Sequence, residues 1–544
     1  MLSKSALECP VPEILNPLER VKIPRGITLA QYDAIVVGGG HNGLVAANYL
    51  ARAGMSVLVL ERRGFVGGAC ITEELFPGFR VSSCSYICYM LQGKVIEDLE
   101  LRKHGFEVHT LEPYRFHPFP NGEYLLGWHD DERTANEIRR ISPRDAERYP
   151  DWVAFWGQAA DILKRYFLTE PPTIAEIAAS VKGTPDERVF ERMLTGNMKD
   201  LAEQYFESDL IRASYTDAQD AGDVRAPGSI MAVAYYKTAM LSEDENVGIP
   251  YGGMGGITQA MARSAEASGV EIRTGVEIQR IVIQNERATG VVLTDGEEIS
   301  TDVVVSNADP KRTFLGLIDT ATLGPEFVEQ IKRLKNGVTY LKFHCALKEL
   351  PDFSAHLGKN FDPHYLAQAR ICPSVEYHEQ SWEDAKRGLP SSCPVMSIQI
   401  PSVYEESLTP PDQHVMSVWV LYAPPQLREG SWDEANRRIG EQLIDTINEY
   451  APNFRDAIID WKLFTPPDLE RRVYLTNGSI RHTDITIDQM LSQRFDGGRS
   501  GYSTPIKGLY LCGAASHPGG GVMGACGKNA AEEILRDYGS REAW

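Results

Sequence analysis

The sequence predicts a mixed α/β and α+β fold, in which one nucleotide-binding domain is assembled from discontinuous segments and a second domain combines a mixed sheet with helices. Three observations support this prediction: a strand–helix–strand unit at 32–61, a run of strands at 270–310, and a strand and glycine-rich turn at 508–527 that lead into a helix. The long stretches between these segments are expected to form the second domain.

Length, composition and charge limit the possible functions before any motif is considered. The 544 residues are 43% hydrophobic and 24% charged, which is typical of a folded protein and excludes disorder as the main state. The net charge of −20 repels phosphate backbones, so nucleic acid is not expected as a partner. A catalytic or small-molecule-binding role is therefore the starting expectation.

The first segment is a strand–helix–strand unit with a glycine-rich turn. Residues 32–37 are typical of a buried strand, 44–53 of a helix and 55–60 of a second buried strand. The turn between the first strand and the helix has the sequence GGGHNG. This order is typical of a Rossmann-like unit, which holds the pyrophosphate of a dinucleotide at a helix N-terminus.

Three glycines and one acid in this unit have separate expected roles. Gly38 permits the tight turn, Gly40 lets a pyrophosphate approach the backbone, and Gly43 allows the helix to pack closely on the strand. Glu61 follows the second strand, where it can accept hydrogen bonds from a ribose. The alternative is a glycine-rich turn that binds nothing.

A second glycine pair follows the ribose acid. Arg62 opens this segment, and Gly67, Gly68 and Ala69 come shortly after it. A simple NAD domain does not use such a pair, whereas ExxxxxGG after the second strand resembles flavoproteins that include amine oxidases and phytoene desaturases. In those proteins the loop runs under the FAD pyrophosphate. An ordinary Gly-Gly loop is the alternative.

Two distant segments resemble the remaining cofactor-binding parts of the same flavoproteins. Residues 270–310 alternate like strands around a Thr-Asp-Gly turn, and Val276 matches the residue that meets adenine through its backbone. Near the C-terminus a strand leads to Gly513 and Ala514 and then to HPGGGVMGA before a helix. In phytoene desaturase-type enzymes the matching segment wraps the flavin, and its glycines expose backbone N–H groups.

Over residues 32–535 the chain resembles the phytoene desaturase superfamily of FAD-dependent oxidoreductases. The GHNG turn, the YGGMGGITQAMA and DITIDQM segments and the HPGGGVMGA tail are most similar to the branch with O-type carotene ketolases and proteins named for a pyridine nucleotide-disulfide oxidoreductase domain. The resemblance implies an amine oxidase/phytoene desaturase-like fold with FAD as its cofactor. The residues expected to bind FAD are Gly38, Gly40, His41, Asn42, Gly43, Glu61, Arg62, Gly67, Gly68, Ala69, Val276, Gly513, Ala514, Gly521, Val522 and Met523.

The predicted domain organisation alternates cofactor and substrate segments. It comprises an N-terminal arm at 1–31, FAD-binding parts at 32–115, 245–335 and 480–544, a helical substrate or lid region at 116–244, and a substrate-domain sheet at 336–479. The helical region carries aromatic residues, among them Trp152, Trp156 and Tyr166, at helical spacing. They are expected to be core residues, or alternatively the wall of a substrate tunnel or a membrane-dipping face.

Metal and dithiol chemistry receive little support from the sequence. Neither HxxH nor HExxH occurs, so no metal site is expected. Cys84 and Cys88 have CxxxC spacing, which does not match the CxxC or CxxxxC of disulfide oxidoreductases. The GGMGG at 252–256 follows no buried strand and is expected to open a helix, so a second nucleotide site is missing. Electrons are therefore expected to leave the flavin to oxygen or a quinone.

The expected location is the cytoplasm. No run of about 18 uncharged apolar residues is present, and residues 1–31 lack the apolar centre of a signal peptide. The cysteines show no disulfide framework, which favours a reducing compartment. Peripheral contact with a membrane stays open but is not predicted, because the negative charge disfavours anionic lipids.

The expected activity is hydride transfer from a largely apolar substrate to flavin N5, with formation of a double bond. Family resemblance selects this reaction, and the catalytic residues stay unassigned. His517 is a weak candidate because it lies in the flavin-facing turn, whereas His41 is expected to position the backbone. The alternatives are an amine oxidase, a polyene ketolase or isomerase, and a non-enzymatic FAD-binding interaction protein.

Overall fold

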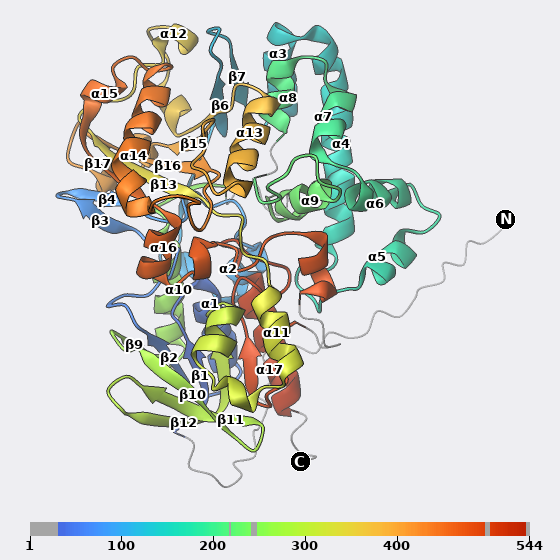
Figure 1. Ribbon diagram of the computed structural model, residues 1–544, viewed down its shortest axis with the longest axis vertical. Helices are drawn as coiled ribbons and strands as arrows, with labels where there is room; N and C mark the ends of the chain where they lie inside the picture. The colour runs from blue at the N-terminus through green and yellow to red at the C-terminus, as the bar shows by residue number, and fades with distance from the viewer. Residues whose placement is uncertain (1–30, 217–218, 241–246, 495–500, 540–544) are drawn as a thin grey trace, which may run out of the picture.

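A computed structural model describes residues 31–216, 219–240, 247–494 and 501–539, and it contains two seven-stranded sheets. One sheet lies in the lower half of Figure 1 and the other in the upper half, with a group of helices beside the upper sheet. The predicted N-terminal arm, apart from residue 31, lies outside the described residues.

The lower sheet is Rossmann-like. Its parallel strands run in the order β9, β2, β1, β12 and β18, and the β10–β11 hairpin extends β12 in antiparallel fashion. The strands are β1 (Tyr32–Val37), β2 (Val57–Glu61), β9 (Glu271–Thr274), β10 (Ile278–Gln284), β11 (Arg287–Leu293), β12 (Glu298–Ser306) and β18 (Leu509–Leu511). Because these strands come from three separated segments, the prediction of a discontinuous α/β domain is confirmed.

Alternation along β1 explains how helices cover both faces of this sheet. Ala34 and Val36 pack with α1 and α17 on one face, while Ile35 and Val37 join a second apolar cluster that includes residues of α11. Successive strand residues point to opposite faces, and both faces of a parallel sheet are normally buried. The helices are α1 (His41–Arg52), α11 (Pro325–Arg333) and α17 (Ala525–Gly539).

The upper sheet has the order β17, β13, β16, β15, β14, β6 and β7. Its strands are β6 (Arg115–Pro118), β7 (Tyr124–Gly127), β13 (Leu341–Leu347), β14 (Gln368–Ile371), β15 (Val395–Gln399), β16 (His414–Leu421) and β17 (Ile458–Phe464). The region expected to be helical thus contributes the β6–β7 hairpin. A short turn closes this hairpin, in which the Phe119 N–H donates to the Glu123 carbonyl.

The two faces of the upper sheet differ sharply in polarity. Phe343, Val418, Ile398, Ala369 and Phe116 lie on one face and pack in an apolar cluster with α14 (Trp432–Asn448). The next residue along each strand falls on the opposite face. That face carries a cross-strand row of Lys342, Trp419, Ser397 and Arg370.

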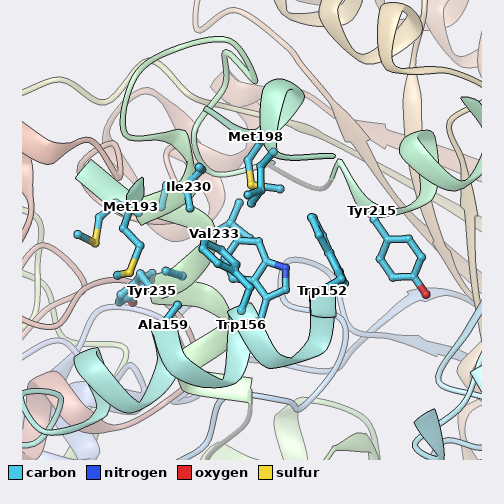
Figure 2. Packing of buried hydrophobic residues seen from close by; sticks show 14 of the residues in the cluster. Trp152, Trp156, Ala159, Met193, Met198, Tyr215, Ile230, Val233 and Tyr235 are labelled. Atoms are coloured by element: carbon cyan, nitrogen blue, oxygen red, sulfur yellow. The ribbon is translucent and has the colours of Figure 1, made fainter. Parts of the chain in front are cut away.

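Seven helices form the layer beside the upper sheet (Figure 1). They are α3 (Asp131–Ile141), α4 (Pro143–Lys164), α5 (Ile174–Val181), α6 (Asp186–Thr195), α7 (Met198–Tyr205), α8 (Asp209–Tyr215) and α9 (Ser229–Met240). The Ser142 hydroxyl accepts from the Asp145 N–H and so caps α4, with Pro143 at its first position. Trp152 and Trp156 of this helix pack with Val233 and Tyr235 of α9 (Figure 2).

The GGMGG segment opens a helix, as predicted. α10 begins within it, and a Cβ on Gly253 would lie 2.5 Å from the Thr72 hydroxyl oxygen, so this turn has no room for a side chain. Further elements are α2 (Gly93–Asp98), β3 (Glu73–Phe76), β4 (Phe79–Val81), β5 (Val108–Thr110), β8 (Gly248–Pro250), α10 (Gly255–Ala267), α12 (Ser354–Leu357), α13 (Val375–Lys386), α15 (Phe454–Ala457) and α16 (Pro466–Val473). Within the described ranges, none of the helices combines the length and apolarity needed to cross a membrane.

Candidate cofactor and substrate site

A cavity of about 480 Å³ lies at the carboxyl ends of β1 and β2. Residues from all three predicted cofactor segments line it, although they are far apart in the sequence. The predicted FAD-binding residues in its wall are Gly38, Gly40, His41, Asn42, Glu61, Arg62, Gly68, Ala69, Val276 and Ala514.

The N-terminus of α1 faces this cavity without a side-chain cap. Gly40 is the N-cap residue and supplies no capping hydrogen bond, and the first turn of the helix has no acidic residue. Asn42 is 1% exposed, and its Oδ1 has no hydrogen-bond partner in the described structure. The positive end of the helix dipole is therefore available to an anion, as a dinucleotide pyrophosphate requires.

Two predicted glycines shape the site from behind the cavity wall. A Cβ on Gly43 would lie 2.3 Å from the Gly38 carbonyl oxygen, so only glycine lets α1 pack this closely against the turn. Gly67 has a φ of +129°, and its N–H donates to the Gly39 carbonyl at 2.8 Å. This bond ties the second glycine pair to the first turn.

Glu61 joins three segments through hydrogen bonds. Its Oε2 accepts from the Gly39 N–H at 2.9 Å and its Oε1 accepts from the Arg63 N–H at 2.9 Å, while its backbone carbonyl accepts from the Val276 N–H at 3.0 Å. A carboxylate has about four lone-pair sites, so Glu61 keeps acceptor capacity toward the cavity. This arrangement fits the expected contact with a ribose.

Cationic side chains on one side of the cavity form a cluster that sequence reasoning missed in part. The Arg62 guanidinium lies 3.6 Å from the ring centroid of Tyr474, and the Arg312 guanidinium lies 4.2 Å from it. Both arginines and Tyr474 line the cavity. Cation–π contact holds these charges where an anionic cofactor would lie. Tyr474 and Arg312 occur in no nucleotide-binding motif, so only the folded chain reveals them.

The C-terminal turn divides its predicted residues between wall and support. Gly521 and Val522 line a smaller cavity of about 80 Å³. Gly513 lies behind the wall, where a Cβ would come within 2.8 Å of the Asn307 carbonyl oxygen, and Met523 is fully buried in the core. Glycine at 513 therefore permits close approach between β18 and the turn that follows β12.

The histidines connect backbone segments. His41 Nε2 donates to the Gly521 carbonyl at 2.8 Å and so links the first and last glycine turns; burial lowers its pKa to about 4. His517 Nε2 donates to the Tyr166 carbonyl at 2.6 Å, and burial lowers its pKa to about 4. His517 lines neither the 480 Å³ cavity nor the 80 Å³ cavity. This contact supports a structural role for His517.

The 80 Å³ cavity lies between the cofactor cavity and a third cavity of about 310 Å³. The residues that it shares with the cofactor cavity are His41, Ala69 and Ile480. Those that it shares with the third cavity are Tyr86, Ile87 and Tyr89. The three cavities therefore follow one another between the lower sheet and the helical layer, each separated from the next by a shared wall.

Aromatic side chains dominate the 310 Å³ cavity. They are Tyr86, Tyr89, Tyr114, Trp128, Tyr149, Trp152, Trp156, Tyr215 and Tyr236. The predicted aromatic face of α4 thus serves both as core and as cavity wall. Tyr236 lines the cavity, whereas the neighbouring Tyr235 hydroxyl donates to the Gly520 carbonyl at 2.7 Å and supports the C-terminal turn.

Lys342 is a buried amine that sequence reasoning missed. It is 3% exposed, and its Nζ donates to the Ser417 hydroxyl at 2.7 Å and lies 5.3 Å from the ring centroid of Tyr86. Burial lowers its pKa to about 7, and the nearby Cys84 only partly offsets this effect. The alternation of β13 predicted a polar face here, but not that helices would cover it.

The two cysteines considered for dithiol chemistry are buried and free. Cys84 lines the 80 Å³ cavity, and burial raises its pKa; burial raises the pKa of Cys88 to about 12. A thiol must ionise to attack a disulfide, so these environments disfavour exchange. In the described ranges, no group of three or more His, Cys, Asp or Glu residues is placed to hold a metal ion.

A Rossmann-like sheet, an uncapped helix N-terminus and a dinucleotide-sized cavity beside a substrate-sized cavity define a dinucleotide-dependent oxidoreductase. Residues 43–351 match the family described as flavin containing amine oxidoreductase, and the chain belongs to this family. The protein is therefore an FAD-dependent oxidoreductase that acts on a small molecule.

The relatives confirm the predicted resemblance to phytoene desaturases. The chain is 34% identical to pyridine nucleotide-disulfide oxidoreductase domain-containing protein 2 of Rattus norvegicus, over 94% of each chain. It is 28% identical to a limonene dehydrogenase polypeptide of Castellaniella defragrans, over 94% of this chain and 96% of the relative. It is 23% identical to a lycopene-forming phytoene desaturase of Pseudescherichia vulneris, over 92% and 99%.

A solved structure confirms the predicted fold class. A triple mutant of putrescine oxidase superposes with a TM-score of 0.61 at 15% identity, covering 93% of this chain and 99% of the oxidase. At this level of identity the likeness concerns the fold alone.

Proposed function

We propose that the protein is a dehydrogenase that removes a hydride and a proton from neighbouring atoms of a small, largely apolar substrate and so forms a double bond. The observation that carries this proposal is the series of three cavities with shared walls. The aromatic walls of the 310 Å³ cavity suit a flat, unsaturated body. The names of two relatives, one a limonene dehydrogenase and the other a phytoene desaturase, refer to the same class of reaction.

The cofactor assignment follows the geometry of the three predicted segments. The N–H groups at the start of α1 would hold the pyrophosphate, Glu61 a ribose, the Val276 backbone the adenine, and Gly521 and Val522 the flavin end. When bound, FAD supplies the acceptor for the hydride. We assign the cofactor domain to 32–115, 245–335 and 480–544, and the substrate domain to 116–244 and 336–479.

Lys342 is the proposed destination of the proton. Its neutral Nζ would accept the proton while the C–H electron pairs form the hydride and the new double bond. Tyr86, whose ring lies 5.3 Å from this nitrogen, lines both the 80 Å³ and 310 Å³ cavities. A base is most effective when its pKa is near the working pH, and burial lowers the pKa of Lys342 to about 7.

The remaining walls exclude water and orient the substrate. Burial of aromatic side chains around both cavities removes solvent from the region between cofactor and substrate, which strengthens each polar contact made there. We propose oxygen or a quinone as the final electron acceptor, because the described glycine-rich segments provide one nucleotide site and GGMGG opens a helix.

Anaerobic spectroscopy of the FAD-loaded protein tests this proposal. Candidate substrates with adjacent saturated carbons should bleach the oxidised flavin absorbance, and mass spectrometry should find a product that has lost two hydrogens. Adding oxygen or a soluble quinone should restore the absorbance. Bleaching by amines, with release of an aldehyde on reoxidation, would instead identify an amine oxidase. A product that gains oxygen or keeps its mass would identify a ketolase or an isomerase.

A further inference from the structure

The polar groups of the 310 Å³ cavity are mainly positive, although the chain as a whole carries a net charge of −20. Arg115, Lys237 and Arg370 line this cavity, and Asp131 is the carboxylate among its lining residues. An acidic protein repels anions at long range. A local excess of positive charge in a low-dielectric cavity reverses that preference at the site itself.

The register of the upper sheet places two of these cations together. Ala369 of β14 pairs with Phe116 of β6 in a parallel ladder, so Arg370 and Arg115, which flank that pair, share the opposite face. Arg370 is also directly opposite Ser397 of β15. Arg370, Arg115 and Ser397 all line the cavity, and Arg370 is 3% exposed.

Arg115 is a half-buried cation that contacts aromatic rings. Its guanidinium lies 5.5 Å from the ring centroid of Tyr215 and 5.9 Å from that of Tyr114. Over the part of the chain that the structure describes, it forms no ion pair with a carboxylate. Since a guanidinium carries five N–H donors and no acceptor, Arg115 presents a fork suited to a planar anion.

Trp156 provides a second donor in the same cavity. Its side chain is 4% exposed, and its Nε1 has no hydrogen-bond partner in the described structure. The ring nitrogen lies on the side that faces Trp152 (Figure 2), which also lines the cavity. An indole N–H can only donate, and leaving it buried without an acceptor is unfavourable. A ligand with acceptor oxygens would satisfy it.

We infer that the substrate of the proposed dehydrogenase is a compact carboxylate with an aromatic or unsaturated body. The carboxylate pairs with Arg115, a second acceptor atom receives the Trp156 N–H, and the aromatic walls hold the body. The volume of about 310 Å³ is near the lower limit for small-molecule pockets, roughly 300–1,000 Å³, and so favours a compact molecule. The inference rests on the proposed function for its reaction, but not for its binding chemistry.

Binding of 3-phenylpropanoate to the FAD-loaded protein tests this assignment, with quenching of tryptophan fluorescence as the readout. The neutral comparison is 3-phenylpropanamide and the cationic one is 3-phenylpropylamine. The test variant is Arg115→Gln. The matched control is Arg140→Gln, because Arg140 of α3 also lies over a tyrosine, 4.3 Å from the Tyr124 ring centroid, but is exposed and outside the cavity wall.

We expect the carboxylate to bind more tightly than the amide, and the amine to bind most weakly. Arg115→Gln should weaken binding of the carboxylate by about tenfold or more, with little change for the amide, and Arg140→Gln should change neither. FAD content confirms that the variants are folded. Equal carboxylate affinity in wild type and Arg115→Gln, tighter binding of the amine, or no saturable carboxylate binding overturns the inference.

The fluorescence readout separates this inference from the proposed function. Tight, Arg115-dependent binding of 3-phenylpropanoate supports the carboxylate site even if carboxylates never bleach the flavin, in which case the dehydrogenase proposal fails alone. Bleaching by an uncharged hydrocarbon, together with absent carboxylate binding, supports the dehydrogenase and overturns the carboxylate site.

Discussion

Replacing Lys342 by methionine should stabilise the protein and abolish most of its activity. Lys342 is 3% exposed and donates to the Ser417 hydroxyl, and burial lowers its pKa from 10.5 to about 7. Methionine has a similar length but carries no charge. The substitution therefore removes the cost of holding an ammonium group in the interior, and it also removes the proposed proton acceptor.

The expected stabilisation depends on pH in a defined way. Below pH 7 the lysine is protonated in both the folded and the unfolded chain, so the folded state bears the full cost of the buried charge. The difference of 3.5 between the two pKa values corresponds to roughly 5 kcal/mol. Between pH 7 and 10.5 the unfolded chain binds the proton that the folded chain lacks, so raising the pH stabilises the wild type. The gap between variant and wild type should thus shrink by about 3 kcal/mol from pH 7 to pH 9.

Urea unfolding of the wild type, Lys342→Met and Lys348→Met from pH 6 to pH 10 measures this gap. Lys348 follows the same strand and is exposed, so its variant should track the wild type at every pH. In the flavin-reduction assay, Lys342→Met should lose about 10²- to 10⁴-fold in rate. The wild-type rate should fall about tenfold per unit below pH 7, as the neutral amine disappears. A gap that does not vary with pH, or full activity in Lys342→Met, would refute the reasoning.

Three further predictions concern the cofactor site and its support. Gly43→Ala should cost about 1–3 kcal/mol and deplete bound FAD, because its Cβ would lie 2.3 Å from a carbonyl oxygen; Gly324→Ala, where a Cβ meets nothing within 4 Å, should keep its FAD, and equal FAD content in both would contradict this. Asp220→Asn should lower stability by about 3–5 kcal/mol in thermal unfolding, because it leaves the buried Arg481 guanidinium without its carboxylate; an unchanged melting temperature would count against this. Cys84→Ser should retain FAD and normal photoreduction, because burial raises the pKa of this thiol; loss of flavin reoxidation would revive dithiol chemistry.

The cofactor half of the site was predictable because its signals are local. Within 30 residues a strand, a glycine turn, a helix and a second strand specify where a pyrophosphate and a ribose can lie, and the structure reproduces those elements within a few residues. Hydrogen bonds such as that from the Val276 N–H to Glu61 then join segments that had been assigned separately.

The substrate half depended on tertiary structure. Alternation in β13 and β14 indicates that Lys342 and Arg370 lie on the polar faces of their strands, and an antiparallel sheet commonly turns such a face to water. Here the helical layer covers it, which buries these cations beside Trp156 of α4. Local spacing sets which way a side chain points, whereas strand register and the packing of distant helices decide what it meets. That is why the glycine turns announced a nucleotide, and why the charge inside the substrate cavity emerged only from the folded chain.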